Sequence, residues 1–82
     1  MLGFEHLHNR LVAEVRGRIR SGELTERGLA LRAGLSQPHM HHVLKGKRAF
    51  SLRSADAVLL ELRLDVIDLL RPEDFADSPA RR

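Results

Sequence analysis

The sequence lacks cysteine, tryptophan and tyrosine, and its three aromatic residues are all phenylalanine. Without cysteine, no disulfide framework, thiolate metal site or cysteine nucleophile can form. The shortage of aromatic rings argues against the stacking platforms that bind RNA and single strands. No apolar run reaches the ~20 residues of a membrane-spanning helix, and Met1–Arg10 lacks the apolar core of a signal peptide. We therefore expect neither a membrane segment nor a secretion signal.

Catalytic motifs are missing as well. The 82 residues, 43% hydrophobic and 30% charged, suffice for one small globular domain. They contain no nucleophile–base pair and no glycine-rich phosphate loop, and a domain of this size has little room for a substrate cavity. We expect a protein that is not an enzyme and needs no cofactor or metal.

What the chain does have is an uneven distribution of charge. Residues 1–48 carry nine Lys and Arg against four Asp and Glu, whereas residues 49–82 carry five against seven. The basic half is where a polyanion would bind. Because aromatic residues are scarce, duplex DNA is favoured over single strands or RNA.

The pattern of apolar residues and helix breakers predicts an all-α fold. Phe4, Leu7, Leu11, Val15 and Ile19 recur at helical spacing, and no segment alternates at period two. Capping residues precede the later apolar segments, and glycine or proline follows several of them. Five helices are expected, at residues 4–20, 26–33, 37–45, 52–62 and 66–70. Residues 1–71 would form the domain, and 72–82 a short tail that frays.

The most informative stretch is 26–45, two short helices joined by a glycine-containing turn. Ala30 would be small because the helices cross there, and Gly34 would supply the positive φ of the turn. Met40 and Val43 would pin the second helix to the core. The side chains then left facing outward are Gln37, Pro38, His41, His42 and Lys45.

This spacing is typical of a helix-turn-helix, and the residues match one family. The run LTERGLALRAGLSQPHMHHVLKGKR resembles the lambda-repressor-like, Xre-type DNA-binding domains, and the likeness continues through FSLRSADAVLLELRLDVIDLL. The resemblance implies a compact five-helix domain whose second and third helices form the helix-turn-helix. It implies a sequence-specific regulator of transcription, acting as a homodimer on a pseudo-palindromic operator in double-stranded DNA. The resemblance also implies a cytoplasmic protein encoded by a bacterium or a phage.

By the same resemblance, the helix 37–45 enters the major groove. Gln37 can offer a paired donor and acceptor to adenine, and His42 can donate to guanine. The residues implied to contact bases are Ser36, Gln37, Pro38, His39 and His42. Those implied to contact phosphates are Arg27, Lys45, Lys47 and Arg48.

Three features depart from the family pattern. Glu26 stands where many members have a glutamine that reaches a phosphate, and we expect Arg27 and nearby amides to offset its charge. Leu44 stands where many members have glutamate. Three histidines on the recognition helix are also uncommon. These departures concern the DNA contacts rather than the fold.

The C-terminal half carries more aliphatic residues than one small core needs. A surplus of this kind predicts a two-fold contact between copies, and the family commonly dimerises through this end. The expected interface residues are Leu60, Leu64, Val66, Ile67 and Leu70.

The remaining titratable residues are predicted to be surface side chains with no metal or catalytic role. His39, His41 and His42 lack a nearby carboxylate or cysteine to complete a metal site, so neutral surface histidines or a pH-sensitive DNA contact are preferred. His6 and His8 fall on the polar side of the first helix. The carboxylates Glu73, Asp74 and Asp77 are interpreted as solvated charge.

Two other functions remain open. One is an antitoxin-type module that binds a partner protein such as a toxin, with DNA binding secondary. The other is an architectural protein that binds duplex DNA without sequence preference. A regulator can also act by contact with RNA polymerase or by excluding it.

Overall fold

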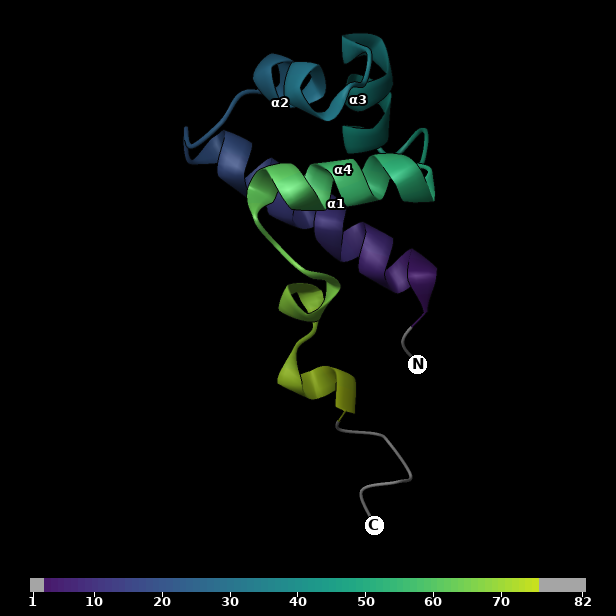
Figure 1. Ribbon diagram of the computed structural model, residues 1–82. Coiled ribbons are helices and arrows are strands. Elements are labelled where there is room, and N and C mark those ends of the chain that lie inside the picture. The colour runs from purple at the N-terminus through teal and green to yellow at the C-terminus, as the bar shows by residue number, and fades with distance from the viewer. Residues whose placement is uncertain (1–2, 76–82) are drawn as a thin grey trace.

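The computed structural model describes residues 3–75, and within them every regular element is a helix. In Figure 1, α2 and α3 lie together at one end of the molecule, α1 and α4 lie beneath them, and the chain then descends through η1 and η2. No helix in residues 3–75 is long and apolar enough to cross a membrane. The α-helices are α1 (Phe4–Arg20), α2 (Glu26–Ala33), α3 (Gln37–Leu44) and α4 (Leu52–Leu62), and the 3-10 helices are η1 (Val66–Leu69) and η2 (Pro72–Phe75).

Hydroxyl side chains fix where α2, α3 and α4 begin. Thr25 accepts a hydrogen bond from the Gly28 N–H at 3.0 Å, and Ser36 accepts one from the His39 N–H at 3.2 Å. Ser51 does the same for α4. Each cap satisfies an amide that has no partner inside its helix, which typically contributes about 1 kcal/mol. The predicted starts of these helices are confirmed.

The predicted fifth α-helix is wrong, because residues 66–69 form a single 3-10 turn. This segment is confined on both sides. Arg63 before it ends α4 in the left-handed region at φ 58°, and Leu70 after it is already extended. Pro72 follows soon afterwards and disfavours helical backbone at the residue before it. The structure thus has four α-helices within residues 3–75, and α3 ends at Leu44, one residue before the predicted end.

One apolar core joins all four α-helices to η1. Val15, Leu29, Met40 and Val58 have no measurable exposure, and within residues 3–75 no polar or charged residue is part of this core. Because α2 and α3 each bury one face in this core, their outer faces are held in fixed positions. The buried residues are Leu11, Val15, Leu29, Ala30, Met40, Val43, Leu44, Phe50, Val58, Leu59, Leu62 and Leu69.

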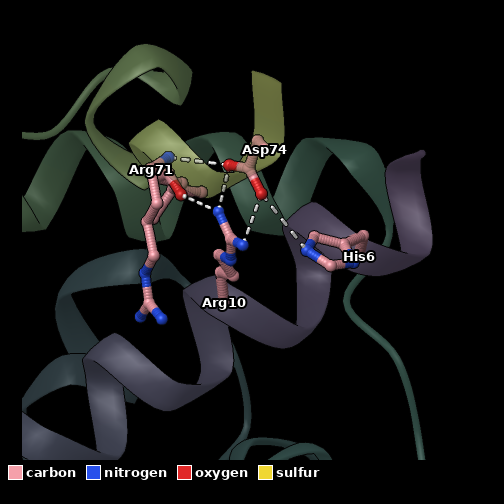
Figure 2. A network of polar contacts seen from close by, with 5 residues as sticks. His6, Arg10, Arg71 and Asp74 are labelled. Atoms are coloured by element: carbon pink, nitrogen blue, oxygen red, sulfur yellow. Dashed lines mark hydrogen bonds and ion pairs between the residues drawn. The ribbon is translucent and has the colours of Figure 1, made fainter. Parts of the chain in front are cut away.

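An ion pair ties the end of the described chain to α1 (Figure 2). The Arg10 guanidinium donates two hydrogen bonds to the Asp74 carboxylate and a third to the Leu69 carbonyl at 3.0 Å. The Arg71 N–H donates to the same carboxylate at 2.7 Å, and His6 Nε2 lies 3.7 Å from it.

Two sequence predictions about this segment are therefore corrected. The Asp74 side chain, expected to be solvated, is only 4% exposed because Arg10 and the chain around it cover it. Residues 72–75, expected to fray, form η2 and are held against α1. Glu73 is exposed, as expected of solvated charge, and Asp77 lies outside the described residues.

This ion pair predicts an acid-sensitive contribution to stability. The hydrogen bonds from Arg10, with smaller contributions from the Arg71 N–H and the Arg10 charge, lower the pKa of Asp74 from 3.8 to about 2. A lowered carboxyl pKa stabilises the fold above its unfolded value, and the gain is lost as pH falls toward about 2. Asp74→Asn should therefore lower the melting temperature at neutral pH, and the difference from wild type should shrink as pH falls from 4 to 2.

Thermal unfolding followed by circular dichroism measures this difference. Asp56→Asn is the matched control, since Asp56 is exposed on α4 and forms no ion pair within residues 3–75. An Asp74→Asn gap of the same size at pH 2 and pH 7 would show that the charge of the carboxylate is irrelevant.

Candidate nucleic-acid interface

A three-residue turn, residues 34–36, fixes α3 relative to α2. Gly34 ends α2 in the left-handed region at φ 75°, which glycine adopts without a steric penalty. The Leu35 N–H then donates to the Ala30 carbonyl at 2.8 Å, closing the C-terminus of α2. Ala30 itself is 1% exposed, at the place where the sequence predicts a close crossing. The conformation predicted for Gly34 is confirmed.

The helix α3 is buried on one face and exposed on the other. Met40, Val43 and Leu44 lie in the core. The first turn carries no carboxylate, so its N-terminal end favours negative charge. Of the five residues expected to contact bases, four are exposed and His39 is half-buried; the exposed ones are Ser36, Gln37, Pro38 and His42.

The four residues expected to contact phosphates are all exposed. Arg27 lies on the first turn of α2, and Lys45, Lys47 and Arg48 follow α3 directly. The loop after α3 is anchored, because the Lys47 N–H donates to the His42 carbonyl at 2.9 Å. None of the four forms an ion pair with a carboxylate of residues 3–75. Their charges are therefore available to an external anion.

Sequence reasoning missed two arginines on α1. Arg16 and Arg20 are exposed, and they line a hollow together with Lys47 and Arg48. They also line a second, smaller hollow together with Lys45. Their spacing of four places them on one face of α1, but only the packing of α1 shows which residues they join. We define the basic band as Arg16, Arg20, Lys45, Lys47 and Arg48.

The carboxylate of Glu26 is paired, though not by the residue expected. Glu26 Oε1 lies 3.2 Å from Nδ1 of His41, and no contact with Arg27 is found. When His41 is protonated, this contact becomes an ion pair and offsets the negative charge at the start of α2. His41 is exposed on α3, as expected, and its ring also contacts the start of α2.

His8 has a structural role, although it lies on the side of α1 that the sequence predicts to be polar. His8 Nε2 accepts a hydrogen bond from the Phe50 N–H at 3.0 Å, and the two rings meet edge to face. The contact spans 42 residues of sequence, so no local pattern could reveal it. Within residues 3–75, no three histidine or carboxylate residues are grouped as metal ligands would be.

The five predicted dimer residues divide into two sets. Leu60 and Ile67 are each 75% exposed, and Val66 is 46% exposed. Leu64 and Leu70 are half-buried, and Leu64 packs against the core, which leaves less of both for a partner. The name apolar face is used below for these three exposed residues, Leu60 of α4 and Val66 and Ile67 of η1.

In comparisons with known proteins, no family model, no curated protein and no solved structure matches this chain. The functional proposal therefore depends on the geometry and charge of the residues described above.

Proposed function

We propose that the protein is a sequence-specific, double-stranded-DNA-binding regulator of transcription of the lambda-repressor-like type. In this proposal α2 and α3 form a helix-turn-helix, and α3 lies in the major groove. One observation carries it: α3 buries Met40 and Val43 in the core and exposes Gln37 and His42 on its other face. A short helix held in this way can enter a groove without unfolding any part of the domain.

In this proposal some residues contact base edges and determine sequence preference, and others contact phosphates and position the protein on the duplex. Ser36, Gln37 and Pro38 lie at the N-terminal end of α3, the part of a recognition helix that reaches base edges. Lys45, Lys47 and Arg48 follow α3 and form no ion pair within residues 3–75, which suits the phosphates on either side of the groove. Arg27 is assigned to a phosphate, and the half-buried His39 is assigned to a base edge.

The protein would act as a homodimer without catalysis. Two copies meeting through the apolar face would place their α3 helices in successive major grooves, ~34 Å apart, on a pseudo-palindromic operator. Exposed apolar side chains at Leu60, Val66 and Ile67 support this arrangement. Occupancy of the operator would then exclude RNA polymerase or contact it.

Selection from a random duplex library tests this function. The purified protein is expected to enrich one pseudo-palindromic sequence, which supplies the operator for the experiments below. Retention of duplexes with no enrichment would indicate an architectural protein instead. A folded protein that retains no duplex at low salt would indicate a module that binds another protein.

Gln37→Ala tests the reading of bases. If Gln37 pairs with adenine, its loss should weaken binding to the selected operator by ~1–3 kcal/mol per half-site and relax the choice at one base pair in each half-site. Binding to random duplex should change little, because phosphate contacts are retained. Fluorescence anisotropy on both duplexes measures the two effects.

The matched control is Asn9→Ala, which removes an exposed amide from α1. It should leave both affinities unchanged. Equal losses on operator and random duplex for Gln37→Ala would assign Gln37 to the backbone and refute its role in reading bases.

A further inference from the structure

Ion pairing divides the four arginines of α1 into two kinds. Arg10 is held by Asp74, and Arg18 is held by Glu14 and Glu23. Arg16 and Arg20 form no ion pair with any carboxylate of residues 3–75, and both are exposed. Contacts within residues 3–75 thus account for the charges of Arg10 and Arg18 and not for those of Arg16 and Arg20.

The unpaired arginines lie at the edge of the proposed DNA-binding surface. The smaller hollow brings them together with Lys45 at the end of α3 and Glu26 at the start of α2. Glu26 is the one carboxylate there, and His41 already contacts it at 3.2 Å. Three permanent cations and a histidine therefore surround one carboxylate, so the hollow favours an anion.

The larger hollow extends the same charge to the loop after α3. Arg16 and Arg20 line it together with Lys47 and Arg48, so four cations border one hollow between α1 and this loop. The lining of this hollow also includes the carboxylates Glu5 and Asp56. Guanidinium groups bind phosphate through paired, charge-assisted hydrogen bonds. Their position beside α3 rather than on its outer face suits a backbone contact, not the reading of bases.

We infer that Arg16 and Arg20 bind backbone phosphates of the duplex and extend the interface from α3 onto α1. This inference rests on the proposed function and adds a second helix to it. The contact positions α3 in the groove and carries no sequence information.

The salt dependence of DNA binding tests the inference. Each phosphate contact contributes about 0.9 to the slope of log affinity against log salt. Arg16→Gln/Arg20→Gln removes two such contacts from each subunit of the dimer, so it should flatten that slope by about 3.6. Operator and random duplex should weaken by the same factor, which leaves their ratio unchanged. Arg16→Lys/Arg20→Lys keeps both charges and should retain the slope.

Arg71→Gln is the matched control, because Arg71 is exposed and its side chain forms no ion pair within residues 3–75. Arg71 lies between η1 and η2, and this segment is at the opposite end of the molecule from α3 (Figure 1). Arg71→Gln should leave the slope unchanged, and circular dichroism should show all three variants folded.

Two results would overturn the inference and leave the proposed function standing. One is an unchanged slope for the glutamine double variant, while Lys47→Gln still lowers it. The other is a loss confined to the operator, which would make the arginines readers of bases. Failure of the wild-type protein to bind any duplex would instead reject the proposed function itself.

Discussion

An Ile67→Glu variant is expected to remain folded and yet to lose most of its affinity for the operator. Ile67 is 75% exposed, so the substitution removes little from the core. In a two-fold dimer the same change appears on both subunits and opposes like charges across the apolar face. A subunit that binds alone loses the gain from engaging both half-sites at once, which is on the order of 10²–10⁴ in affinity.

Mass in solution and operator affinity, measured on the same sample, test this prediction. Leu31→Glu is the matched control, because Leu31 is an 81% exposed leucine on α2, outside the apolar face. It adds the same charge and should leave the protein dimeric. An Ile67→Glu protein that is still dimeric, with unchanged operator affinity, would remove the apolar face from the interface.

The second large effect is expected in the core at Leu29. This side chain has no measurable exposure and anchors α2 in the apolar core. Leu29→Ala should lower the free energy of unfolding by ~2–5 kcal/mol, because apolar contacts are lost and a cavity remains. A small domain has only about 5–15 kcal/mol in total, so the loss should shift the unfolding midpoint visibly.

Urea unfolding gives the change in free energy directly. Leu31→Ala, two residues along the same helix on its exposed face, should stay within about 0.5 kcal/mol of wild type. A cost for Leu29→Ala as small as that of the control would mean that α2 is not held by the core, and the fixed position of α3 would then lack its support.

Local signals predicted the α-helices well. The starts at Glu26, Gln37 and Leu52 follow from single capping residues, and the end of α2 follows from Gly34. A cap or a terminating glycine acts within one helical turn. Its effect therefore depends only on residues that are neighbours in the sequence, and the sequence alone is enough to predict it. The exposed face of α3 followed too, because the apolar spacing of Met40 and Val43 fixes which side is buried.

Contacts between distant segments were not predictable in the same way. No local pattern indicates that Asp74 is paired, because its partner Arg10 is 64 residues away in the sequence. The same holds for Arg16 and Arg20, because only the packing of α1 shows which cations lie beside them. The prediction of a fifth α-helix was wrong for a different reason. The apolar spacing in residues 66–70 suits an α-helix, but the turns before and after this segment leave enough residues for only one 3-10 turn.

The ratio of two dissociation constants tests the central claim most directly. The selected operator and a scrambled duplex of the same length and composition are titrated with the wild-type protein at one moderate salt concentration. If α3 reads bases in the major groove, the operator should bind ~10³-fold more tightly or better. A ratio near one would contradict sequence-specific recognition, whatever the affinity for DNA in general.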